Sequence, residues 1–502
     1  MTRSTKLHRV HLWPRAAAVA TLAGLGLVTG CGGDDDGAGP TAATHFEEWA
    51  PWTSPVEAEV GARGVFTTDH GDPELSRGNW STMDLTGDGR PDLVVTRLAG
   101  SASQLGLPGP APHWRVYPGT DTGFAPDPLE WPTPRLPEQA AEGLVRVAQT
   151  SSIDGSWMTS DLDGDGLLDL VELNPESEYI TGDPQFGFPA DPHWRVYRNN
   201  GQGFDPDWIP WSTPASDIGQ LGFFAPTLES TSYYLGAWSM LDLDGDARPE
   251  LVVLRAVSTS DVFGFPGDPH WQVHHNDGTG FAATATRWSV PEEALAGASG
   301  VLLTQGETWS TMDLDGDARP ELVFTRDGGG RQLGHPDQPH WRVYRNVGDG
   351  FAADGEDWTT PGGDGVSTNG FHQPGGGGAA AQDGQWATVD LDGDRRLDLV
   401  VTRFAGDPGQ PGHPEDPYWE VYPGAEGGFT DPGRVWTLPT ELVFTTAGFD
   451  RLGHLGDDDH GVWSTMDLDG DHRPELVLTA GSDQRQLGYP DAPSWMIAYG
   501  RP

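Results

Sequence analysis

Disulfides, lysine and long apolar runs are almost absent from this sequence. Its 502 residues hold one cysteine and one lysine, so no internal disulfide can form and stability must come from packing or bound metal. Seventy-five acidic residues stand against 29 basic ones, a net charge of −46, which argues against nucleic acid and anionic lipid headgroups as partners. Twenty-one tryptophans argue against disorder, the other common meaning of such acidity.

The N-terminus carries a targeting segment. Four basic residues precede a short apolar run, residues 16–27, that is too short to cross a membrane comfortably. Val28-Thr29-Gly30-Cys31 then resembles the lipobox of bacterial lipoprotein signal peptides, which implies cleavage before Cys31 and its acylation. An ordinary secretory signal with a chance cysteine is the alternative.

We therefore predict three regions. Residues 1–30 are a lipoprotein signal peptide, residues 31–45 an acidic flexible tether, and residues 46–502 the folded part. The protein would be exported and held at the membrane through its lipid anchor alone. The glycine after Cys31 resembles the sorting pattern of outer-membrane lipoproteins and favours the outer membrane or cell surface.

Internal repetition dominates the folded part. A block close to W-S-T-M-D-L-D-G-D-x-R-P-E-L-V recurs six times, with its first tryptophans 71 to 81 residues apart. A second block, close to P-H-W-R-V-Y, places a tryptophan 32 to 37 residues later, and a Gly-Phe pair and a third tryptophan follow. The three tryptophan series begin at Trp80, Trp114 and Trp131.

The two ends of the chain complete each other. The sixth copy stops soon after Trp495, before its Gly-Phe pair and third tryptophan would appear, whereas Phe46, Trp49 and Trp52 supply such a piece at the other end. Short β-prone runs such as Leu93-Val94-Val95, 70 glycines and 43 prolines predict strands and turns. The sequence thus predicts an all-β propeller of six blades, closed by the N-terminal strand, with seven blades as the alternative.

The first block contains an acidic loop with oxygen side chains at positions 1, 3, 5 and 9, a spacing that suits one hard cation such as Ca²⁺. Six copies predict up to six calcium sites. The predicted ligands are Asp84, Asp88 and Asp92; Asp161, Asp163, Asp165 and Asp169; Asp242, Asp244, Asp246 and Glu250; Asp313, Asp315, Asp317 and Glu321; Asp390, Asp392, Asp394 and Asp398; and Asp467, Asp469, Asp471 and Glu475. The first copy has Thr86 at position 3 and should bind most weakly.

Two other interpretations of these loops are acidic turns without metal and an EF-hand. Acidic β-turns without metal would also use Asp and Gly, although six copies in register favour metal. An EF-hand is disfavoured, because only Glu172 fits the required glutamate at position 12, and proline at position 8 in four copies leads into short strand-like runs.

The D-x-D-x-D-G-x-x-D loop, the Leu-Val-Val run and the later Gly-x-Gly-Phe resemble FG-GAP/VCBS repeats of integrin-type β-propellers. The resemblance implies calcium in hairpin loops within the blades. Two departures stand out: integrin-type propellers have seven blades, and position 6 is not glycine in four copies, namely Ala247, Ala318, Arg395 and His472. If that position is left-handed, each of the four costs roughly 1–2 kcal/mol.

The repeated tryptophans suggest either blade core or sugar-stacking surfaces, and their presence in every unit favours core. The histidines beside them, His113, His193, His270 and His340, become Tyr418 and Ser494 in the last copies, which argues against a metal site.

Three functions remain. We expect a binding or adhesion module for a protein or glycan ligand, with calcium as a mainly structural ion. A structural envelope lipoprotein and a carbohydrate-active enzyme are the alternatives. We expect no catalysis, because the repeats leave no residues for a catalytic domain and no nucleophile–base pair stands out in the insertion of residues 173–185.

Overall fold

The computed structural model describes fourteen segments of the chain. They are residues 45–55, 79–97, 107, 112–134, 156–174, 193–214, 237–255, 270–291, 308–326, 340–361, 385–403, 418–439, 462–480 and 494–501. Every regular element in them is a strand, and no helix there has the length and apolarity to span a membrane. The predicted signal peptide, Cys31, the tether up to residue 44 and the insertion of residues 175–185 lie outside the described residues.

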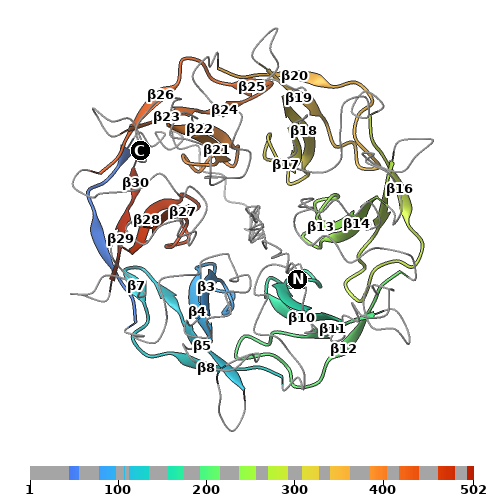
Figure 1. The fold of residues 1–502 in the computed structure, drawn as a ribbon, viewed down its shortest axis with the longest axis vertical. Coiled ribbons are helices and arrows are strands. Elements are labelled where there is room, and N and C mark those ends of the chain that lie inside the picture. Colours follow the sequence, from blue (N-terminus) through green and yellow to red (C-terminus); the bar gives the residue numbers. More distant parts are fainter. Residues whose placement is uncertain are drawn as a thin grey trace, which may run out of the picture.

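Six sheets stand in a ring around a common axis, which confirms the six-bladed β-propeller (Figure 1). The blades are numbered here in chain order, and each is built on four antiparallel strands. In the fourth, fifth and sixth blades two short strands of the next blade extend the sheet to six. The first blade holds β3 (Asn79–Met83), β4 (Asp92–Arg97), β5 (His113–Tyr117) and β8 (Leu129–Pro132), and the second holds β9 (Ser156–Ser160), β10 (Asp169–Asn174), β11 (His193–Tyr197) and β12 (Ile209–Ser212). The third holds β13 (Ala237–Leu241), β14 (Glu250–Arg255), β15 (His270–His274) and β16 (Thr286–Ser289), and the fourth holds β17 (Thr308–Met312), β18 (Glu321–Arg326), β19 (His340–Tyr344) and β20 (Glu356–Thr359). The fifth holds β21 (Gln385–Val389), β22 (Asp398–Arg403), β23 (Tyr418–Tyr422) and β26 (Arg434–Thr437).

The sixth blade joins the two ends of the chain, as the sequence predicts. Its first three strands are β27 (Val462–Met466), β28 (Glu475–Ala480) and β29 (Ser494–Ala498), and its outer strand is β2 (Ala50–Thr53). Trp52 lies opposite Trp495 in the antiparallel register of β2 and β29. The blue N-terminal segment therefore runs beside the red C-terminal strands (Figure 1).

The second and third tryptophan series form one buried pair per blade. Trp114 lies opposite Trp131 across β5 and β8, and the same register recurs in the other five blades. All twelve side chains are at most 1 % exposed. The interpretation of these tryptophans as blade core is confirmed.

Neighbouring blades are joined through the Gly-Phe pair, which lies in short strands such as β7 (Gly123–Phe124) and β25 (Gly428–Phe429). Four of these glycines approach the outer strand of the preceding blade in parallel register, as Gly428 does with Thr359, and His45 makes the same contact with Thr437. A Cβ on Gly280 would lie 2.1 Å from Ser212 Oγ, so a larger residue there would displace the serine side chain. Phe281 then packs edge-on against Trp194 of the preceding blade, with ring centroids 5.2 Å apart.

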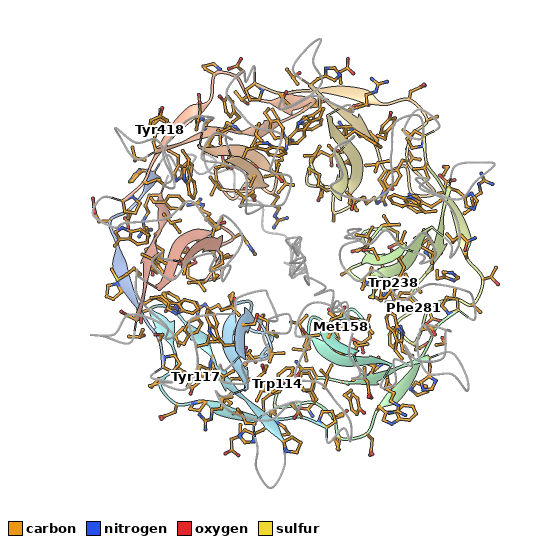
Figure 2. All side chains as sticks on the ribbon, viewed as in Figure 1. Trp114, Tyr117, Met158, Trp238, Phe281 and Tyr418 are labelled. Atoms are coloured by element: carbon orange, nitrogen blue, oxygen red, sulfur yellow. The ribbon has the colours of Figure 1, made fainter. Side chains whose placement is uncertain are left out.

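The hydrophobic core is therefore six separate clusters, one between each two adjacent blades. The cluster of the second and third blades includes Trp194 and Trp211 from one side and Trp238 and Phe281 from the other. Figure 2 shows side chains filling the spaces between blades, with Trp238 and Phe281 in the third. Since both faces of each blade are covered, the second strands are near-continuous apolar runs such as Leu93-Val94-Val95.

Candidate metal centre in the acidic loops

The six acidic loops occupy equivalent places in the blades, between the first and second strands. Position 1 follows the first strand, and position 9 is the first residue of the second strand in every blade. The prediction that the loop opens into a strand is confirmed. The sequence thus brings positions 1 to 9 together at one end of each blade's inner hairpin.

The aspartates at positions 1 and 5 shape the loop by accepting backbone N–H groups. In the second blade Asp161 accepts from Gly164 at 2.8 Å and from Gly166 at 2.9 Å, and Asp165 accepts from Leu167 at 2.9 Å. The same bonds recur in all six loops, with distances between 2.6 and 3.0 Å. These carboxylates are therefore partly engaged before any cation is considered.

Position 6 is left-handed in every blade. Gly89 and Gly166 have φ of +86° and +87°, and the four non-glycine residues at this position have φ between 68° and 72°. They are the residues named from the sequence: Ala247, Ala318, Arg395 and His472. The predicted strain is confirmed, since an L-residue pays roughly 1–2 kcal/mol in this conformation.

Position 9 places a buried carboxylate under each loop. All six side chains, Asp92, Asp169, Glu250, Glu321, Asp398 and Glu475, are at most 2 % exposed. In five blades one carboxylate oxygen accepts the backbone N–H of position 2, at 2.7 to 3.0 Å. Asp169 of the second blade instead accepts from Asn199 N at 2.9 Å.

Burial sets the protonation of these groups. Desolvation raises the pKa of Asp92 to about 7, of Glu250 and Glu321 to about 8, and of Glu475 to about 9. The pKa of Asp398 is also raised well above its ordinary value, mainly by burial and next by the Asp392 charge. Burial therefore favours a bound proton or cation at these position-9 carboxylates.

The structure brings the predicted ligands together in subsets. Positions 1, 3 and 5 of the second and third loops, and positions 1, 3 and 9 of the fourth and fifth, place ligand atoms within 4.8 Å of one another. In the first loop the Thr86 hydroxyl, at position 3, donates to Asp92 Oδ1 at 3.4 Å.

Some carboxylate oxygens of these loops are buried without a hydrogen-bond partner among the described residues. Among the described residues, Asp163 Oδ1, Asp169 Oδ2 and Asp392 Oδ1 are buried and accept no hydrogen bond. A buried carboxylate oxygen without a partner is costly, and oxygen-only donor sets suit Ca²⁺. The residues present therefore fit a hard divalent cation.

The sequence interpretation missed the side chains that face position 3. They come from the residue after the third strand's H-W-R-V-Y motif. Arg198 pairs with Asp163 at 3.1 Å in the second blade, Arg345 pairs with Asp315 in the fourth, and His275 takes this place in the third. The sequence feature that could have revealed them is a repeat position at which the residue type changes from blade to blade: Pro118, Arg198, His275, Arg345, Pro423 and Tyr499.

A second contact missed from the sequence links the loops of neighbouring blades. Arg90 Nε donates to the backbone carbonyl of Asp469 in the sixth blade at 2.9 Å, and Arg319 Nε to that of Asp244 in the third at 3.3 Å. Position 7 of one loop thus bonds position 3 of the preceding one, so their geometries are coupled.

Among the residues whose exposure is described, one tryptophan outside the repeated pairs is exposed. Trp208, at the edge of the second blade, has 42 % of its surface accessible. The His193 ring stacks on it with centroids 5.5 Å apart at 17°, and the Arg195 guanidinium lies 5.0 Å from its centre. His193 therefore has a packing role, as the broken histidine series predicted.

No protein-family profile matches the chain, and no curated protein does either. Among solved structures, it is similar to a lectin of Agrocybe aegerita described as recognising non-reducing terminal N-acetylglucosamine, at 14% identity and a TM-score of 0.40, over 92% of this chain and 96% of the lectin. A rhamnogalacturonan lyase matches at 14% identity and a TM-score of 0.29, over 92% of this chain and 75% of the lyase. A β-xylosidase/α-arabinofuranosidase from a compost metagenome matches at 10% identity and a TM-score of 0.22, over 70% and 91%.

These matches contradict the expectation that the protein is not an enzyme. That expectation assumed that a chain made of repeats leaves no room for a catalytic domain, yet chains matched over most of their length include a lyase and a glycosidase. The premise was wrong, because a fold does not limit which chemistry is placed on it. The chain is a six-bladed β-propeller.

Proposed function

We propose that this chain is an exported, lipid-anchored binding protein of the outer membrane or cell surface, a calcium-stabilised propeller of the FG-GAP/VCBS type. The observation that carries the proposal is the sixfold buried carboxylate at position 9 beneath a loop of carboxylate oxygens. The ligands would be the side chains at positions 1, 3, 5 and 9. Calcium would supply the positive charge that these buried groups otherwise obtain from protons or arginines.

The expected contribution of calcium is large. At about 1 mM calcium and a dissociation constant of about 0.1 mM, each site stabilises the fold by about 1.4 kcal/mol. Five or six sites would then contribute roughly 7–8 kcal/mol, comparable with the whole stability of an ordinary domain. Such a contribution would stand in for the disulfides that a single cysteine excludes.

For the ligand we favour a glycan, and Trp208 supports this choice. One part of its surface rests on His193 and Arg195, which hold the indole in place, and the rest is open to solvent. Arg195 is itself anchored 3.4 Å from the buried carboxylate of Glu172. A fixed aromatic surface beside hydrogen-bond donors is suited to the apolar face and hydroxyl groups of a sugar ring.

The experiment combines a glycan array in millimolar calcium with the Trp208→Ala variant. We expect one class of sugar to be retained by the protein and lost by the variant, at unchanged melting temperature. Leu129→Ala, at an exposed apolar residue on the first blade's outer strand, is the matched control and should keep retention. Retention that survives Trp208→Ala would contradict this placement, and no retention of any sugar would favour a protein ligand or a structural envelope role.

A further inference from the structure

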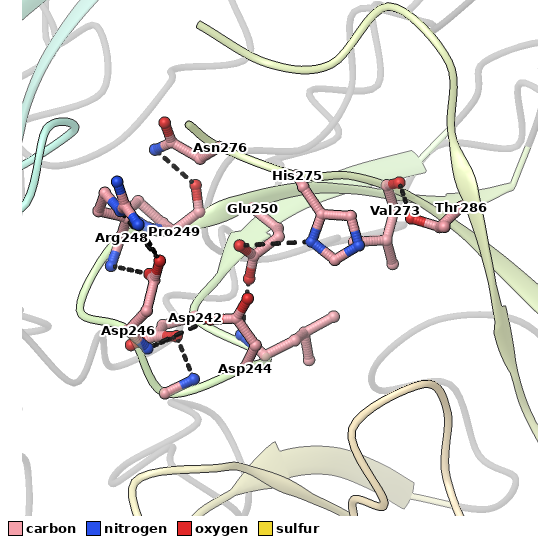
Figure 3. A network of polar contacts seen from close by, with 12 residues as sticks. Asp242, Asp244, Asp246, Arg248, Pro249, Glu250, Val273, His275, Asn276 and Thr286 are labelled. Carbon is pink, nitrogen blue, oxygen red and sulfur yellow. Dashed lines mark hydrogen bonds and ion pairs between the residues drawn. The ribbon is translucent and has the colours of Figure 1, made fainter. Parts of the chain in front are cut away.

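The third acidic loop differs from the others because an imidazole faces it. His275 lies directly after β15, and its Nδ1 is 3.9 Å from Glu250 Oε1 (Figure 3). Ligand atoms of Asp244, Glu250 and His275 all lie within 4.8 Å of one another. The side chains thus converge from the loop, the start of β14 and the end of β15.

The two oxygens of the Glu250 carboxylate face different groups. Its side chain is 1 % exposed, and Oε2 accepts the backbone N–H of Leu243 at 2.9 Å. The other oxygen, Oε1, faces His275 at a distance too long for a hydrogen bond. A buried carboxylate oxygen therefore points at the imidazole with a gap between them.

The nearby guanidinium does not fill this gap. Arg248 pairs with the Asp246 carboxylate, through Nε at 3.0 Å and through its terminal nitrogen. In the second and fourth blades, by contrast, Arg198 and Arg345 pair directly with the position-3 aspartate. Where these two blades have a permanently charged guanidinium, the third blade has the imidazole of His275, whose nitrogen lone pair can bind a metal ion.

Donor chemistry and spacing agree on the kind of ion. Imidazole with carboxylates suits Zn²⁺ and similar transition metals, whereas Ca²⁺ takes oxygen ligands. Two atoms bonded to one tetrahedral Zn²⁺ at about 2.0–2.2 Å lie about 3.4 Å apart. The 3.9 Å between His275 Nδ1 and Glu250 Oε1 is about 0.5 Å longer, so a small side-chain movement would bring both atoms onto one ion.

We propose that Asp244, Glu250 and His275 form a transition-metal site of the zinc class, with three protein ligands and a remaining position open to water. The site concerns the third loop alone, and it does not depend on calcium binding in the other five. Where both ions are present, zinc would displace calcium from this loop only.

The test uses the purified full chain, freed of metal by a chelator and titrated with Zn²⁺ by calorimetry and with Co²⁺ by visible absorption. We expect one strong Zn²⁺ site per chain and a Co²⁺ spectrum with nitrogen and oxygen ligands. His275→Arg copies the second and fourth blades, so it should fold normally, and it should weaken Zn²⁺ binding by about 100-fold or more.

The reciprocal variant is Arg345→His, which recreates the third blade's arrangement beside Asp315 and Glu321 of the fourth. It should raise the count of strong Zn²⁺ sites from one to two. Zinc binding that is unchanged in His275→Arg, or seen only at concentrations at which any surface histidine binds, would overturn the proposal. Repeating the titration in excess calcium separates the two hypotheses, because a calcium failure leaves the zinc count at one.

Discussion

The loops of the first and fifth blades form a matched pair with one important difference. Both end in aspartate at position 9, and in both a glycine N–H donates to that carboxylate, from Gly119 to Asp92 at 3.1 Å and from Gly424 to Asp398 at 3.0 Å. At position 3, however, the first blade has Thr86 and the fifth has Asp392.

That difference decides whether a hydrogen-bond donor or a second carboxylate faces the position-9 carboxylate. The Thr86 hydroxyl donates to Asp92, so a neutral group completes the first loop. Asp392 instead adds a charge whose Oδ1 is buried without a hydrogen-bond partner, and it raises the pKa of Asp398 further. We therefore expect the fifth loop to depend on a cation more than the first.

The largest expected effect is that of pH on the calcium-free protein. The position-9 groups have ordinary pKa values of 3.8 or 4.5, raised in the fold to about 7 for Asp92 and about 9 for Glu475. The folded state therefore binds more protons between these values, and its stability falls as pH rises through them. In EGTA we expect the melting temperature to drop from pH 5 to pH 9 by an amount equivalent to several kcal/mol.

Calcium should reverse that trend, because it binds the ionised carboxylates. The melting-temperature gain from calcium should be greater at pH 8 than at pH 5. A gain that is equal at both values would contradict binding at the position-9 groups.

The contacts between blades come next. Phe124→Ala and Phe429→Ala remove the rings that pack against Trp495 and Trp341. Each should destabilise the fold by about 3–5 kcal/mol, measured by urea unfolding. Since Phe124 packs on the blade that closes the ring, a much smaller loss for Phe124→Ala would mean that the ring opens there first.

Exchanging the residues at position 3 between the first and fifth loops tests the comparison of these two loops. Asp392→Thr should remove one calcium site and about 1.4 kcal/mol of stability in 1 mM calcium, yet stabilise the protein in EGTA by removing a carboxylate whose Oδ1 is buried without a hydrogen-bond partner. Thr86→Asp should have the opposite signs in both conditions. Thermal melts with and without calcium measure both, and a change of the same sign in both conditions would show that the aspartate acts only through the loop's own hydrogen bonds.

The smallest effect concerns the left-handed position 6. Arg395→Gly in the fifth loop should stabilise by up to about 1 kcal/mol, and Gly89→Ala in the first should destabilise by about 1 kcal/mol. A Cβ on Gly89 would meet no atom within 4 Å, so this variant reports backbone strain alone. Equal unfolding midpoints for Gly89→Ala and the parent protein would contradict the strain.

The sequence predicted the structural features that recur at the same position of every repeat. The closure of the sixth blade by the N-terminal strand followed from counting units, and the strain at Arg395 followed from the glycines that occupy the same position in two other copies. It could not predict which side chain faces position 3, because Arg198, His275 and Arg345 come from another strand and vary from blade to blade. The parallel contact of Gly428 with Thr359 was also missed, since no local pattern encodes contacts between blades.

The most direct test of calcium as the structural ion is a thermal melt of the purified chain in EGTA and then in millimolar calcium, with bound metal counted by mass spectrometry. We predict a large upward shift with five or six metal ions per chain, and a first loop that is the last to fill. A melting temperature that does not change, with no metal retained, would contradict the account and leave six acidic turns that protons and arginines alone stabilise.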